Sequence, residues 1–163
     1  MIDLKEIKNK ILKKENLYFL AVTLFIFVID RYSKIEIINN FSNSRVYFND
    51  FLNFDLIWNT GIGFGIFSTE SVLIYNLITI FIGLVLLVLC WILLTSDRID
   101  KLIFSLIIGG AIGNFYDRLT LKAVPDFIDI HYKDFHWFTF NIADIFITLG
   151  IISFVSRSLF AKN

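Results

Sequence analysis

The feature that most constrains the fold of this chain is an apolar run from Val72 to Leu94, which is interrupted by the polar residues Asn76 and Thr79. A helix that crosses the hydrocarbon core of a bilayer needs about twenty consecutive apolar residues, so this run predicts a transmembrane helix. Hydrophobic residues make up 56% of the 163 residues, more than one soluble core of this length can bury. We therefore expect an integral membrane protein with a single domain over residues 1–163.

The earliest apolar run is shorter and extends from Leu17 to Ile29. To cross a bilayer, its helix must continue through Asp30 and Lys34 towards Ile38. Asp30 and Lys34 lie one helical turn apart and can form an ion pair; a structural pair and a role in a functional site are both open. The run follows a basic start without a small-residue cleavage site, so we expect a retained span rather than a cleaved signal peptide.

Two later runs complete a prediction of four transmembrane helices. The third run extends from Ile99 to about Leu121, and the fourth from Phe138 to about Phe154. The fourth begins in an aromatic cluster of the kind that anchors a helix at a membrane interface. The third contains small residues that allow helices to pack closely, namely Gly109, Gly110, Ala111 and Gly113.

The positions of Lys and Arg predict the orientation in the membrane. Lysines crowd the first fourteen residues, Arg98 and Lys101 lie between the second and third runs, and Arg157 and Lys162 follow the fourth. Because cytoplasmic segments carry the excess of basic residues, both termini are expected in the cytoplasm. The formal net charge is zero, so nucleic acid is not expected as a partner.

The two segments on the other side, residues 39–70 and 119–137, predict a small β-sheet on the outer membrane surface. Apolar residues recur at every second position, as in a half-buried strand, at Leu52, Phe54, Leu56 and Trp58. Glycines follow at the same period and suit the close approach of a backbone or ligand, at Gly61, Gly63 and Gly65.

Asp126 and Asp144 stand where apolar segments ordinarily carry no charge. An ionisable group in such a segment is costly and is a functional-site hypothesis by default. Both residues are expected at the outer face of the bilayer, where two facing carboxylates would share one proton and serve as acid and base. A structural alternative has Asp126 cap a helix or turn after Pro125, and Asp144 pair with Arg118.

Other polar residues have weaker claims to chemistry. His131 and His136 stand in an outer aromatic loop without the HExxH spacing of a zinc helix, so they are interpreted as interfacial side chains. Asn114, Asp117 and Arg118 form a polar end to the third run. Asp117 and Arg118 are expected to form a structural pair, and positioning of substrate carbonyls is the functional alternative.

Five strings stand out along the chain, namely DRYSK at residues 30–34, NTGIGFG at 59–65, GGAIGNFYDR at 109–118, DFID at 126–129 and FNIAD at 140–144. Together they resemble the lipoprotein signal peptidase (signal peptidase II) family. They span nearly the whole chain in the order of the family. The resemblance implies a four-helix aspartic endopeptidase of the bacterial inner membrane. Such an enzyme removes signal peptides from prolipoproteins that carry diacylglycerol, and it cuts just before the lipidated cysteine.

The resemblance also implies roles for particular residues. It assigns catalysis to Asp126 and Asp144, with a water between them and without a metal or organic cofactor. It implies a supporting or substrate-binding shell of Asp30, Lys34, Asn59, Gly61, Asn114, Asp117, Arg118 and Asn141. The implied partners are lipid-modified prolipoproteins and membrane lipid, and the enzyme is expected to be a monomer. Pro125 and the Ile62-Gly63 pair depart from the common family pattern.

Two functions of other classes fit parts of the sequence. A proton-coupled transporter or channel subunit would use intramembrane acids as a relay, but the second run contains none and the other acids gather towards one face. A scaffold that binds lipid or a partner helix would use the glycine-rich third run. The scaffold leaves the paired acids unexplained.

Overall fold

The computed structural model describes residues 13–41, 45–61 and 71–160. In this part of the chain, four helices and four strands follow one another. The helices are α2 (Glu15–Phe41), α3 (Val72–Thr95), α4 (Arg98–Thr120) and α5 (Ile142–Phe160). The strands are β1 (Val46–Asn49), β2 (Leu52–Asn59), β3 (Val124–Tyr132) and β4 (Phe135–Phe140).

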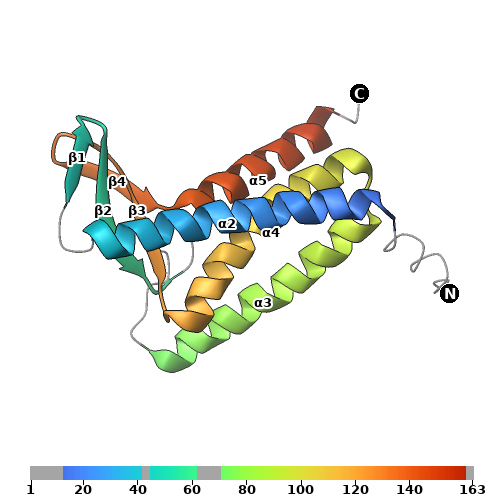
Figure 1. Ribbon diagram of the computed structural model, residues 1–163, viewed down its shortest axis with the longest axis horizontal. Coiled ribbons are helices and arrows are strands. Elements are labelled where there is room, and N and C mark those ends of the chain that lie inside the picture. Colours follow the sequence, from blue (N-terminus) through green and yellow to red (C-terminus); the bar gives the residue numbers. More distant parts are fainter. Residues whose placement is uncertain (1–12, 42–44, 62–70, 161–163) are drawn as a thin grey trace.

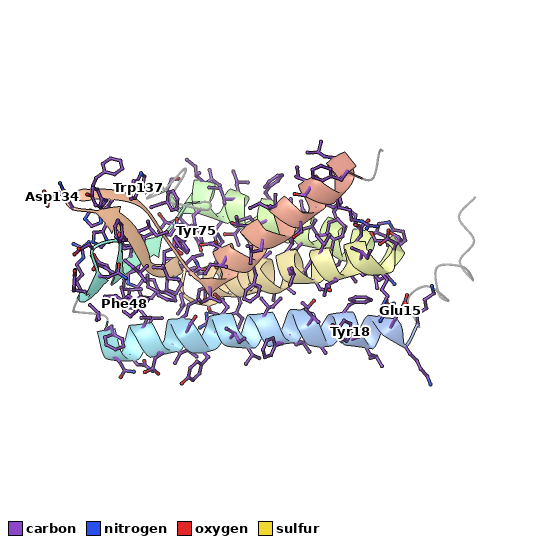
Figure 2. All side chains as sticks on the ribbon, turned by 90° about the horizontal axis from the view of Figure 1, so that it is seen from above. Glu15, Tyr18, Phe48, Tyr75, Asp134 and Trp137 are labelled. Carbon is purple, nitrogen blue, oxygen red and sulfur yellow. The ribbon has the colours of Figure 1, made fainter. Side chains whose placement is uncertain are left out.

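The helices form an elongated bundle with the sheet at one end, which we call the sheet end (Figure 1). The opposite end holds the start of α2, the turn between α3 and α4, and the end of α5. Helix α4 is central because it packs against α2, α3 and α5. Figure 2 shows the same polarity in side chains, with Asp134 and Trp137 at the sheet end and Glu15 and Tyr18 at the other.

Small residues on α4 permit the close contacts that its central place requires. A Cβ atom on Gly109 would lie 2.8 Å from Cβ of Ile26 in α2. A Cβ atom on Gly110 would overlap the backbone oxygen of Ala143 in α5. The glycine-rich stretch that the sequence assigned to close helix packing therefore serves two neighbours at once.

The sheet is antiparallel, with the strand order β1-β2-β3-β4. Its central pair joins β2 to β3, and Asn59 pairs with Val124 at the end nearest the helices. β4 pairs with β3 only from Ile128 onwards. Pro125 therefore lies where β3 has a neighbour on one side alone, a place that tolerates a residue without a backbone N–H.

Three helices in the described part of the chain, α3, α4 and α5, are long and apolar enough to cross a membrane. They match the second, third and fourth predicted spans. Helix α2 covers the first predicted span and continues past Ile38, but it is not among these three. A fourth transmembrane helix therefore stays a prediction.

Two predicted details are wrong. The fourth helix begins at Ile142 rather than Phe138, because Phe138 and Phe140 belong to β4 and pair with β3. The apolar residues of β2 were also expected to form its buried face, and they do not. Asn53 and Asn59 are buried, whereas Trp58 is exposed. The predicted small sheet itself is present, and it also includes much of the segment expected as an aromatic loop.

Candidate active site at the sheet end of the bundle

Asp126 and Asp144 reach one cavity from two different elements. Asp126 is the third residue of β3, and Asp144 lies in the first turn of α5. Both line a cavity of about 280 Å³ between the sheet and helices α3, α4 and α5. Its wall combines polar side chains from Asn59, Asn114 and Arg118 with apolar ones that include Ile82, Ile147 and Ile151.

The carboxylate of Asp126 is buried between two asparagine amides. Asn141 Nδ2 donates to Oδ1 at 2.6 Å, and Asn59 Nδ2 donates to Oδ2 at 2.9 Å. Burial and then the negative charge of Asp144 raise the pKa of Asp126 to about 6, because both disfavour the ionised form. Asp126 therefore retains its proton to a higher pH than an ordinary carboxyl group.

Asp144 is held by the start of its own helix. Asn141 precedes α5, and its Oδ1 accepts from the Asp144 N–H at 3.1 Å while Asp144 Oδ2 accepts from the Asn141 N–H at 3.2 Å. This reciprocal pair is a capping box. Asn114 Nδ2 donates to the other oxygen, Oδ1, at 2.8 Å. Asn141 thus contacts both carboxylates and fixes their relative positions.

A buried ion network lies behind the two carboxylates. Lys34 Nζ donates to Asp30 Oδ2 at 2.8 Å and to Asp117 Oδ2 at 2.7 Å. It also donates at 2.7 Å to Oδ1 of Asn114, the residue that holds Asp144. Arg31 pairs with the second oxygen of Asp117. Since a charge removed from water needs full pairing, this network fixes α2 against α4 at the depth of the site.

Asp30 also connects α2 to α5. Its Oδ1 accepts from the backbone N–H of Ala143 at 3.0 Å, one of the donors that a helix start leaves without a partner. A Cβ atom on Gly113 would overlap Oδ2 of Asp30. A glycine on α4 therefore makes the room in which this carboxylate lies between three helices.

Arg118 positions the backbone that follows β2. Its Nη2 donates to the oxygen of Gly61 at 2.5 Å, and Nη1 donates to the oxygen of Asn114 at 3.2 Å. The Gly61 N–H donates to Asn59 Oδ1 at 2.8 Å, which directs Asn59 Nδ2 towards Asp126. Arg118 acts on Asp126 through this chain of contacts.

Comparison with known proteins gives the family. The model of the family described as signal peptidase (SPase) II matches residues 22–160. The chain belongs to this family. Lipoprotein signal peptidase of Pelagibacter ubique is 46% identical over 95% of this chain and 95% of its own length. The enzyme of the same name from Francisella tularensis subsp. novicida is 32% identical over 93% of this chain and 98% of its own.

Solved structures agree with this membership. A bacterial membrane enzyme, solved by the in meso method, superposes with a TM-score of 0.75 at 28% identity and covers 90% of each chain. A second bacterial membrane enzyme superposes with a TM-score of 0.71 at 28% identity, covering 87% of this chain and 92% of its own. This signal peptidase II family member is therefore a membrane peptidase.

The structure brings every predicted site residue into connected contacts, but the expected Asp117–Arg118 pair and the alternative Asp144–Arg118 pair are both wrong. Asp117 pairs with Lys34 and Arg31, not with Arg118, because adjacent residues on a helix point in different directions. Asp144 contacts Asn114 and Asn141 rather than pairing with Arg118. The Asp30–Lys34 ion pair is present. Gly63 and Gly65 lie outside the described residues.

Arg31 is the member of the network that the sequence interpretation missed. It enters that interpretation only as the second letter of the DRYSK string at residues 30–34 and is given no role. The sequence did contain an indication of this role, because Arg31 follows Asp30 and lies one helical turn before Lys34. Two cations one turn apart on a helix can both reach the same carboxylate, here that of Asp117.

A larger apolar cavity of about 520 Å³ lies towards the opposite end, where Leu17, Cys90 and Leu94 are among its lining residues. None of the described residues that line it is acidic, so it is not the candidate site.

Proposed function

We propose that this protein is an aspartic endopeptidase that removes the signal peptide from diacylglyceryl-modified prolipoproteins, cutting just before the lipidated cysteine. The relatives named lipoprotein signal peptidase support the substrate class. The observation that carries the chemistry is the convergence of Asp126 and Asp144 on one cavity, with Asn141 contacting both. Two adjacent carboxyl groups that share a proton are the arrangement on which aspartic proteases rely.

The environments divide the roles between the two acids. We assign the shared proton to Asp126, because burial and then the charge of Asp144 raise its pKa to about 6. Asp144 lies at the N-terminus of α5, where the helix dipole and its N–H donors favour a carboxylate. Asp144 is therefore the base for the attacking water, and Asp126 is the acid.

The reaction then proceeds through a tetrahedral diol. Asp144 takes a proton from the water while the water oxygen attacks the scissile carbonyl carbon. Asp126 gives its own proton to the carbonyl oxygen. Asp144 next passes the acquired proton to the amide nitrogen, and the C–N bond breaks. One diol hydroxyl returns its proton to Asp126 as the new carboxyl group forms, which restores the starting state.

Arg118 is proposed to position the substrate. Within the described part of the chain, its buried Nε makes no hydrogen bond. A buried donor left without a partner is costly, and a substrate carbonyl entering the cavity would satisfy it. Apolar wall residues such as Ile82 and Ile151 are suited to the lipid-modified end of the substrate.

A second, almost wholly apolar groove of about 290 Å³ runs beside Asp144 between the hairpin and α5. Phe138, Phe140 and Leu149 line it. The continuity of this groove with Asp144 makes it a path for an extended substrate segment.

We place the enzyme in the bacterial inner membrane as a monomer with four transmembrane helices. Its active site then lies near the outer face of the bilayer, where the acyl chains of the substrate remain in lipid while water reaches the two acids.

The test is cleavage of a diacylglyceryl prolipoprotein by purified Asp126→Asn and Asp144→Asn variants under single-turnover conditions. Asn keeps the size of the side chain but cannot exchange a proton, so each variant should lose about a hundred- to ten-thousand-fold in rate. The double variant should be hardly slower than either single one, because the pair acts as a unit.

Asp134→Asn is the matched control, since Asp134 lies in the turn between β3 and β4 at the sheet end (Figure 2) and is not among the residues that line the cavity. It should cleave at the wild-type rate. A thermal-shift measurement on all four variants separates lost chemistry from lost folding. Near-normal cleavage by a folded Asp126→Asn or Asp144→Asn protein would remove that residue from the catalytic pair.

A further inference from the structure

The hairpin of β3 and β4 gathers three potential metal ligands on the sheet, outside the candidate active site. Asp129 and His131 stand two positions apart on β3, so their side chains share one face. The strand register places His131 opposite His136 of β4, and the two rings stack with centroids 5.3 Å apart. The sequence gives no helical metal motif because strand pairing, not helical spacing, creates this group.

The distances in the group are close to those of a coordination sphere. The Asp129 carboxylate lies 2.8 Å from His136 Nδ1 and 3.8 Å from His131 Nδ1. One ligand atom from each of the three residues lies within 4.8 Å of the others. In a tetrahedral zinc site with bonds of about 2.0–2.1 Å, ligand atoms are about 3.3 Å apart. Side-chain movements of about an ångström would therefore complete the geometry.

We propose that Asp129, His131 and His136 form a binding site for a divalent transition metal, with zinc as the best match. Two imidazoles and one carboxylate supply three of the four ligands that Zn²⁺ takes, and water takes the fourth position. His136 is exposed, whereas Asp129 and His131 are buried. The group is thus partly built into the sheet and partly open for the metal to enter.

A second set of contacts prepares His131 to be a ligand. Asn53 is satisfied when its Nδ2 donates to the Leu52 oxygen at 3.1 Å and its Oδ1 accepts from Arg45 Nε and Nη2 at 3.2 Å each. In that orientation Oδ1 also faces His131 Nε2, 3.3 Å away. Nε2 then carries the proton, and Nδ1 keeps its lone pair directed towards Asp129. Such partners commonly orient ligand histidines.

Arg45 is the competing cation in the metal-free protein. Its Nη2 donates to Asp129 Oδ2 at 2.7 Å and lies 3.1 Å from His136 Nδ1. The guanidinium has other partners within reach, since its Nε lies 3.7 Å from Asp55 Oδ2 and faces the Asn53 amide. Because the Arg45 side chain is exposed, a metal displaces it from Asp129 without leaving a buried charge unpaired.

The site would clamp the hairpin that carries the proposed catalytic pair. β3 begins beside Asp126, and β4 leads directly into Asn141 and α5. A metal that joins β3 to β4 stabilises their register by binding only the folded form. This proposal does not rest on the peptidase function, because its ligands lie outside the cavity of Asp126 and Asp144.

Zinc binding is tested on full-length, detergent-purified protein that has a histidine-free affinity tag and has been treated with a chelator. The chain contains two histidines in all, so histidine coordination must come from this hairpin. Isothermal titration should show one Zn²⁺ per chain. Co²⁺ as a spectroscopic probe should give the visible bands of a tetrahedral site, and saturating Zn²⁺ should raise the melting temperature by several degrees.

Variants assign the binding to the three residues. His136→Gln and Asp129→Asn should each weaken Zn²⁺ affinity at least tenfold, whereas Arg45→Gln should strengthen it several-fold by removing the competitor. Asp134→Asn, in the same hairpin but outside the group, should match the wild type. His136→Gln changes an exposed side chain, and its metal-free melting temperature and prolipoprotein cleavage verify that it folds.

Two results would overturn the proposal. Failure of the folded wild-type protein to bind millimolar Zn²⁺ or Co²⁺ would show that the group is an ion pair network only. Binding that His136→Gln and Asp129→Asn leave unchanged would place the metal elsewhere. Either result would leave the proposed peptidase function intact, because cleavage is measured separately.

Discussion

At the scale of single residues, the site depends on charged and amide groups that satisfy one another in a buried setting. Lys34 is fully buried and has three partners. Asn141 and Asn59 both donate to Asp126. Removal of one partner from such a network leaves another group buried and unpaired, which costs more than the lost contact alone. The carboxyl group of Asp126 is tuned by this setting rather than by a single neighbour.

The raised pKa of Asp126 has a consequence for stability. A carboxyl group whose pKa is about 6 in the folded protein and 3.8 by default binds more protons when folded. Its protonation therefore stabilises the fold fully below about pH 4, and this contribution is lost as the pH rises through about 6. The loss amounts to at most about 3 kcal/mol.

Asp126→Asn should remove this part of the pH dependence. We expect the melting temperature of the variant, relative to the wild type, to increase between pH 4.5 and pH 7.5, whatever its offset at low pH. Thermal-shift curves across this range, with Asp134→Asn as the reference, measure the change. If the melting temperatures of Asp126→Asn and wild type differed by the same amount at every pH in this range, the raised pKa of Asp126 would be contradicted.

The sequence was sufficient to identify the two acids, because a charge in an apolar segment has few structural explanations. It was not sufficient to assign their partners. Asp144 is satisfied by the capping box with Asn141 and by Asn114 from another helix, and only the second contact needs tertiary structure. Asp117 was paired with the wrong arginine, since its two cations come from α2, which is far away in the chain.

At the scale of elements, hydropathy predicted α3 and α4 to within one residue at each end, because a membrane span is fixed by length and composition. The start of α5 was missed by four residues. The aromatic residues that precede α5 are compatible with an interfacial helix and with a strand, and only their pairing with β3 shows that they form a strand. The capping signal of Asn141 and Asp144 was nevertheless in the sequence.

The contact between α4 and α5 gives the prediction at this scale. Gly110→Ala would drive a Cβ atom into the Ala143 oxygen and to 3.0 Å from Ile147, so it should separate the helices beside Asp144. We expect a loss of stability of about 1–3 kcal/mol and reduced cleavage.

Gly83→Ala is the matched control for Gly110→Ala. Its Cβ atom would meet only the end of the Phe115 ring, at 3.1 Å, and a ring can shift where a backbone cannot. Alanine also favours a helix over glycine by about 1 kcal/mol, so this variant should be close to neutral. Equal melting temperatures and cleavage rates for the two variants would contradict the close packing of α4 on α5.

At the scale of the whole molecule, the two ends have different chemistry. The sheet end holds the buried acids, whereas the opposite end has ion pairs such as Arg157 with Asp97 at 2.6 Å and Lys101 with Glu15 at 3.0 Å. The sequence predicted this sheet from residues 39–70 and 119–137 but interpreted the stretch around His131 and His136 as an aromatic loop. The pairing of β4 with β3 was missed because the aromatic side chains of β4 are mostly exposed, so this segment shows no alternation of apolar and polar residues.

This polarity leads to a prediction about orientation. The basic residues flanking the opposite end predict that it faces the cytoplasm, which places the sheet and both acids on the outer side. Reporter fusions after Asn163 and within residues 96–100 should give cytoplasmic signals, and a fusion in the turn at Lys133 and Asp134 should give an extracytoplasmic one. A single cysteine at residue 134, in a Cys90→Ala background, provides the control, since an impermeant thiol reagent should label it in intact cells. An extracytoplasmic signal after Asn163 would show that the orientation is the reverse of the predicted one. The proposed active site would then lie on the cytoplasmic side of the membrane, and the predicted location of the site would be wrong.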